Sequence, residues 1–174
     1  MQLAQVLDVF EGLLVASKHP DIVEIERYGR DVAPGGSSPA GVKARYQSGS
    51  EAYLWGAVWP GEIPITVPDE MPPPKRRADR MAIFAVQLLD VARPDVFTSW
   101  QLVAFPDLGP TDERGKSAAG VSLVCSDGTK MLLRVTAGSG PSGDPAEDPF
   151  PDYRIPEGVK SWHLRVHAQS AAPK

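Results

Sequence analysis

Two Pro-Asp pairs, Pro20-Asp21 and Pro94-Asp95, occupy similar places in the two halves of this chain of 174 residues. Each follows an apolar helical pattern and precedes β-type residues, as the metal-binding aspartate of a restriction-nuclease core does. Such a core also needs an acidic residue and a lysine two positions apart on the following strand, and neither half has that pair. We therefore interpret each Pro-Asp as a helix stop, in which the proline ends the helix and the aspartate bonds nearby backbone.

Three further patterns have residue types suited to a cofactor, a metal or a nucleophile. The glycines of residues 138–143 match a dinucleotide-binding loop, but the prolines that follow rule out the helix that such a loop requires. His163 and His167 share one face of a predicted strand with Arg165, and about 13 Å separates the two histidines, too far to bind one metal. Cys125 lies on the same side of a predicted strand as Val121 and Leu123, which indicates a core position. No residue is nominated as catalytic, and we expect no metal and no cofactor.

A basic cluster precedes or opens the second predicted helix. It consists of Lys75, Arg76, Arg77 and Arg80. Cations at a helix N-terminus oppose the helix dipole. Either Asp69, Glu70 and Asp79 compensate them locally, or the cluster binds an anion or an acidic partner. The acidic stretch 144–152 could fill that second role from within the chain.

An aromatic row is the other candidate contact surface. Tyr53, Trp55 and Trp59 alternate along one side of a predicted strand, and Leu54, Ala57 and Val58 lie on or near the other side. Either the strand is central and buried on both faces, or the aromatic row is exposed to a partner. Both alternatives stay open, and the aromatic row joins the basic cluster as candidate partner-binding residues.

The elements that position these residues follow from the periodicity of the apolar residues. In the first half, a stripe at helical spacing predicts a helix that ends at Pro20. Strands and a hairpin follow, and Pro64 confines the last strand to a sheet edge. These predicted strands are Ile22 to Tyr28, Val42 to Gln47, Glu51 to Trp59 and the short run Ile63, Ile65 and Val67.

The second half has a similar order. Pro72 to Pro74 are predicted to open a helix that is apolar around much of its circumference and ends before Arg93. A long Gly/Pro/acidic segment, 137–160, precedes the last strand. The predicted strands are Val96 to Phe105, Val121 to Cys125, Lys130 to Thr136 and Trp162 to Ala168.

The shared order predicts an internal duplication. A shift of 74 superimposes Pro20 on Pro94, and a shift of 79 superimposes Gly49 on Gly128. The predicted fold class is α+β, with two tandem αββββ repeats, each helix packed on a mostly antiparallel sheet, in one compact pseudo-two-fold domain. The repeats span residues 1–70 and 71–170, and 171–174 form a disordered tail.

Composition limits the classes of function. A formal net charge of −4 argues against nucleic-acid binding, and no apolar run is long enough to span a membrane. One cysteine cannot form an intramolecular disulfide, so we expect a soluble cytoplasmic protein.

The predicted function is a non-enzymatic protein-interaction module, such as an adaptor, a chaperone-like protein or an immunity- or inhibitor-type protein. It would bind a protein partner, and a homodimer is consistent with the same features. Two alternatives stay open: a small-molecule-binding protein or enzyme with a pocket between helix and sheet, and a structural subunit of a larger assembly.

Overall fold

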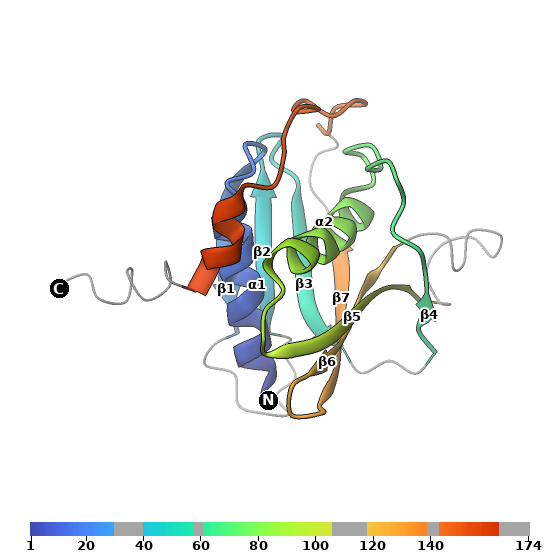
Figure 1. Cartoon of the computed structure of the whole chain (residues 1–174). Coiled ribbons are helices and arrows are strands. Elements are labelled where there is room, and N and C mark those ends of the chain that lie inside the picture. Colours follow the sequence, from blue (N-terminus) through green and yellow to red (C-terminus); the bar gives the residue numbers. More distant parts are fainter. Residues whose placement is uncertain (30–39, 58–60, 106–117, 139–142, 164–174) are drawn as a thin grey trace.

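The structure is a computed structural model that describes residues 1–29, 40–57, 61–105, 118–138 and 143–163. These residues form one seven-stranded antiparallel sheet together with two long helices, an α+β fold (Figure 1). The predicted fold class is confirmed at this level.

The first half of the chain supplies one helix and four strands. They are α1 (Leu3–Ser17), β1 (Ile22–Tyr28), β2 (Gly41–Tyr46), β3 (Glu51–Ala57) and β4 (Ile63–Pro64). The predicted helix, first strand and hairpin are confirmed with small shifts at their ends, and residues 58–59 of the predicted hairpin lie outside the described residues. β4 is an edge strand of two residues, as Pro64 predicts.

The second half supplies one helix, three strands and a short 3-10 helix. They are α2 (Arg77–Ala92), β5 (Phe97–Ala104), β6 (Gly120–Cys125), β7 (Lys130–Ala137) and η1 (Glu157–Ser161). The strand order is β1-β2-β3-β7-β6-β5-β4, and all neighbouring strands are antiparallel. The two halves therefore meet in the middle of the sheet, where β3 pairs with β7.

Both long helices pack on one face of the sheet. Val42, Leu54 and Val135 are cross-strand neighbours and are all buried. They share one hydrophobic core with Phe10 of α1 and Leu88 of α2. Since strand side chains alternate between faces, the opposite face carries Lys43 and Arg45 of β2, Tyr53 and Trp55 of β3 and Arg134 and Thr136 of β7.

Two predicted element boundaries are wrong. The three prolines lie before α2, which begins at Arg77, because each proline that precedes another proline is pushed out of the helical region of backbone space. The predicted last strand does not begin at Trp162: this residue and His163 are helical and follow η1, whose Val159 is completely buried in the core. Residues 164–168 of that predicted strand lie outside the described residues.

The Pro-Asp pairs are not in equivalent positions. Each helix ends shortly before its proline, with Lys18 and Arg93 in the left-handed region at φ 47° and 45°. After that residue, the carbonyl of His19 accepts from Ile22 N, and the carbonyl of Pro94 accepts from Phe97 N, both at 3.1 Å. Pro94 therefore corresponds to His19, and the local shift is 75.

The halves share local features but differ in their fourth strand. Gly49 and Gly128 both have φ 87° in the turns of their hairpins, where a glycine accommodates the left-handed backbone. β4 of the first half pairs across the sheet with β5, whereas η1 takes the fourth place in the described part of the second half. The tandem αββββ repeat is not confirmed.

Candidate functional site

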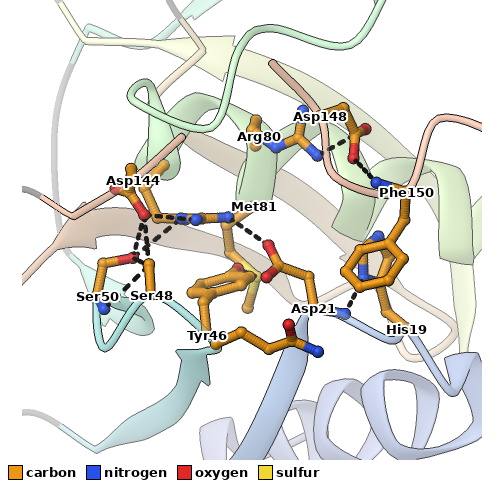
Figure 2. A network of polar contacts seen from close by, with 12 residues as sticks. His19, Asp21, Tyr46, Ser48, Ser50, Arg80, Met81, Asp144, Asp148 and Phe150 are labelled. Atoms are coloured by element: carbon orange, nitrogen blue, oxygen red, sulfur yellow. Dashed lines mark hydrogen bonds and ion pairs between the residues drawn. The ribbon is translucent and has the colours of Figure 1, made fainter. Parts of the chain in front are cut away.

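A buried ion-pair network lies where the start of α2 meets the end of the β2–β3 hairpin (Figure 2). Arg77 is only 3% exposed. Its guanidinium donates to Asp21 Oδ2 at 3.1 Å, to Asp144 Oδ1 at 2.6 Å and to Ser50 Oγ at 3.2 Å. A buried cation with two carboxylates and a hydroxyl has its charge compensated, as burial requires.

Tyr46 forms the floor beneath this arginine. The Arg77 guanidinium carbon lies 3.8 Å from the centroid of the Tyr46 ring, which is a cation–π geometry. The Tyr46 hydroxyl donates to Met81 Sδ at 3.7 Å, and burial raises the pKa of this tyrosine to about 12. Tyr46 therefore stays neutral at physiological pH and acts as a packing partner for the arginine.

Asp144 ties the acidic segment, residues 143–156, to the hairpin. Its Oδ1 atom accepts from Ser48 Oγ at 2.6 Å and from Ser50 Oγ at 2.7 Å, besides Arg77. Burial raises the pKa of Asp144, but these three donors outweigh it, so the pKa lies below its usual 3.8. The carboxylate is ionised in the folded protein.

A second ion pair holds the acidic segment to α2. Arg80 donates to Asp148 Oδ2 at 3.1 Å and to the carbonyl of Pro72 at 2.5 Å. Asp148 also accepts from the backbone N of Phe150 at 2.8 Å. Burial raises the pKa of Asp148, yet the backbone and arginine donors bring it below 3.8. The acidic segment is therefore fastened at two points before it reaches the core through Val159.

A groove of about 750 Å³ lies between α2 and the acidic segment. Its apolar part is largely aromatic, with Phe84 of α2 facing Phe150 and Tyr153 of the acidic segment. The Tyr153 hydroxyl donates to the carbonyl of Ser17 at 2.6 Å, which fixes this wall against the end of α1. The charged residues around the groove are Asp69, Arg80, Asp90, Asp148 and Arg154.

His19 lies at the inner end of the groove among aromatic rings. Its ring centroid is 4.3 Å from that of Tyr153 and 5.3 Å from that of Phe84. Its Nδ1 accepts from the backbone N of Asp21 at 3.2 Å, so the other ring nitrogen carries the proton when the ring is neutral. Burial lowers the pKa of His19 below 6.5, against an opposing effect of the Asp21 carboxylate. The imidazole is therefore neutral at physiological pH.

A much smaller cavity adjoins the network between α2 and the sheet. It has a volume of about 20 Å³ and is lined by Tyr46, Arg77 and Phe84 among others. This is room for about one water molecule and far below the roughly 300–1,000 Å³ of a ligand pocket.

The basic cluster is divided between the interior and the surface. Arg77 and Arg80 are buried and paired with carboxylates of the acidic segment, which is the internal partner that the sequence suggested. Arg76 is exposed and its guanidinium pairs with Asp79 at 2.5 Å, the local compensation that was the other alternative. Lys75 is exposed.

The aromatic row lies elsewhere, on the sheet face opposite the helices. Tyr53 and Trp55 are half-buried on β3; Tyr53 donates to a carboxylate oxygen of Glu51, and Trp55 Nε1 donates to Thr136 Oγ1 at 3.1 Å. Trp59 lies outside the described residues. The basic cluster at the start of α2 and the aromatic row on β3 therefore lie on opposite sides of the sheet.

Sequence reasoning missed Asp21 as a member of the site. Its carboxylate was expected to bond nearby backbone, but it pairs with Arg77, which lies 56 positions away. No local sequence pattern marks such a pair. The indication that the sequence does give is a cluster of arginines at residues 76–80 and a separate acidic stretch at residues 144–152, which could neutralise each other. The groove was missed too, since its walls come from segments about 65 residues apart.

Cys125 is buried in the core, as predicted, and its burial raises the thiol pKa. Among the described residues, no group of three or more His, Cys, Asp or Glu side chains is placed to hold a metal ion. Neither α1 nor α2 has the length and apolar character needed to cross a membrane.

Comparison of the chain with protein-family models, curated proteins and solved structures finds no significant match.

Proposed function

We propose that the protein is an interaction module that binds a peptide segment of a partner protein in the groove between α2 and the acidic segment. The groove itself is the observation that carries this function. It is partly open to solvent and is lined by both aromatic and charged side chains. Binding sites for extended segments combine an apolar floor with a polar rim.

The walls of the groove are held in place before any partner arrives. Arg77–Asp144 and Arg80–Asp148 fasten the acidic segment at one end, and the Tyr153–Ser17 hydrogen bond fastens it further along. A preformed site loses less conformational entropy on binding than one that must order first. The ion pairs therefore support binding without touching the bound segment.

The alternative of an enzyme or a small-molecule binder with a pocket between helix and sheet has less support. The cavity at that place holds about one water. Among the described residues that line the groove there is no serine, threonine, cysteine or lysine side chain. A cytoplasmic location is part of the same proposal, because the single cysteine leaves no disulfide for an oxidising compartment to preserve.

A selection from displayed random dodecapeptides tests this function. Peptides selected on the wild-type protein are synthesised and titrated against two variants. Gln87→Trp places a large ring in the groove from a partly exposed position of α2, and we expect it to weaken binding by about tenfold or more. Ala4→Trp makes the same addition on exposed α1, about four helical turns from His19, and should leave affinity unchanged. Equal affinities for the two variants would refute the groove.

We also infer that the two halves arose by duplication of an αβββ unit. Matching left-handed residues end both helices, and matching glycines turn both hairpins. Gly41 and Gly120, 79 positions apart, both leave no room for a Cβ, which would lie 2.5 Å and 2.2 Å from a carbonyl of the next strand. In homologous sequences the halves should align with each other at shifts of 75 and then 79; alignment at other shifts would argue against duplication.

A further inference from the structure

We infer that the segment bound in the groove is basic, with lysine or arginine beside at least one large apolar side chain. This rests on the proposed function and adds the chemistry of the partner. The charges around the groove carry the argument, since they do not balance once the internal ion pairs are removed.

Arg80 and Asp148, which both line the groove, form an ion pair at 3.1 Å and neutralise each other. Arg154, the other cation of the lining, folds back on its own segment: its NH1 group donates to the carbonyls of Pro151 and Tyr153 at 3.3 and 2.8 Å. The charge of Arg80 is therefore compensated by a carboxylate, whereas Arg154 is hydrogen-bonded to neutral groups and keeps its positive charge. With the Arg80–Asp148 pair set aside, the described lining carries two carboxylates, Asp69 and Asp90, against one cation, Arg154.

Two carboxylates of the lining have no such cationic partner in the described part of the chain. Asp90 is exposed on α2 and accepts only a neutral donor, the indole Nε1 of Trp100 at 2.7 Å. Asp69 is exposed on the segment that leads into α2. Glu70 and Asp152, both exposed, adjoin the two walls in sequence and add to the negative potential. An ammonium or guanidinium group at the rim would pair with these acids.

The aromatic lining of the groove indicates which side chains lie beside the lysine or arginine of the bound segment. Phe84 is 7% exposed, while Phe150 and Tyr153 are partly exposed, so burying an apolar side chain against them removes further apolar surface from water. The aromatic faces also suit the aliphatic stem of lysine or arginine, and an arginine plane above a ring adds a cation–π contact. A volume of about 750 Å³ matches a few residues and exceeds one side chain.

An acidic peptide or a nucleic acid would meet these carboxylates and be repelled. A second copy of this chain is also disfavoured, since the protein has an excess of acidic residues, with a net charge of −4. Charge complementarity therefore favours a basic segment of a different protein.

The selected dodecapeptides test this inference directly. We expect lysine or arginine next to an aromatic or aliphatic residue to be enriched among peptides that Gln87→Trp fails to bind. The double variant Asp69→Asn/Asp90→Asn should bind a selected peptide about fivefold more weakly at low ionic strength, with the difference shrinking at high salt. The amide oxygen of an asparagine at position 90 can still accept the hydrogen bond from Trp100 Nε1, so we expect the fold to be unaffected. The double variant Glu24→Gln/Glu26→Gln on β1 removes two acids away from the groove and serves as the matched control.

The outcomes separate the two proposals. Neutral or acidic peptides that still require an open groove would overturn the basic partner and leave the groove as a binding site. Peptides insensitive to Gln87→Trp would overturn both. If a synthetic peptide of residues 164–174 competes for the groove more strongly than the selected peptides, the occupant is the chain's own end, and the inference of a separate basic partner is overturned.

Discussion

At the scale of single residues, the structure depends on an arginine that the sequence places in a surface-like cluster. Arg77 is buried between Asp21 and Asp144, and removing one partner from a buried ion pair leaves an unpaired charge in the interior. Its neighbour Arg76 is exposed and pairs with Asp79 within the same helical turn. Arg76 and Arg77 are the same residue type at adjacent positions, so helix propensity and charge cannot distinguish the exposed arginine from the buried one.

We expect Arg77→Ala to lower the free energy of unfolding by about 3–5 kcal/mol, because Asp21 and Asp144 lose their shared cation. Arg76→Ala is the matched control and should cost less than about 1 kcal/mol, since exposed pairs contribute little. Urea denaturation followed by circular dichroism measures both. Similar losses for the two variants would contradict the buried network.

The network should also make stability depend on pH. The folded-state pKa values of Asp144 and Asp148 lie below 3.8, so the unfolded chain binds more protons as the pH falls toward that range. Their stabilisation is complete above about pH 5 and is lost as the pH falls through the folded pKa values. Denaturation curves between pH 6 and pH 3 measure this loss, and Asp144→Asn/Asp148→Asn should show a shallower decline. An unchanged slope in that variant would show that other groups are responsible.

At the scale of elements, the sequence predicts most helices and strands because each has one buried face and therefore a clear period. It fails where a residue's place depends on distant segments. From Trp162 onward apolar and polar residues alternate as in a strand, yet Val159 is buried in a short helix and Trp162 continues it. The groove and the Arg77 network could not be predicted for the same reason. Their residues come from the turn after α1, the hairpin, α2 and the acidic segment, and no local pattern records which of these meet.

The helix ends give a prediction at this scale. Lys18 and Arg93 adopt left-handed backbone angles that cost a residue with a Cβ about 1–2 kcal/mol, while glycine adopts them freely. Replacing the residue with glycine removes that cost, but glycine's greater conformational freedom in the unfolded chain offsets about 0.4–1 kcal/mol of the stabilisation. We expect Lys18→Gly to raise the free energy of unfolding by about 0.5–1 kcal/mol. Lys18→Ala retains the Cβ and should leave stability unchanged; a gain from alanine as large as that from glycine would exclude relief of the left-handed backbone as the cause.

At the scale of the whole molecule, one sheet joins the two halves and the helices cover one of its faces (Figure 1). The acidic segment runs past the start of α2 to η1, and its two ion pairs hold it in place as a wall of the groove. The aromatic row at Tyr53 and Trp55 lies on the other face of the sheet. The molecule thus offers two separate candidate surfaces, and the groove is the one with a built cavity.

Hydrogen exchange with and without a selected peptide tests the groove most directly. The acidic segment contains no helix or strand, so its amides should exchange rapidly in the free protein. We predict that bound peptide slows exchange in residues 148–155 and leaves β2 and β3 unchanged. Protection of β3 around Tyr53 and Trp55, with none in residues 148–155, would contradict the groove and place the contact on the opposite face of the sheet.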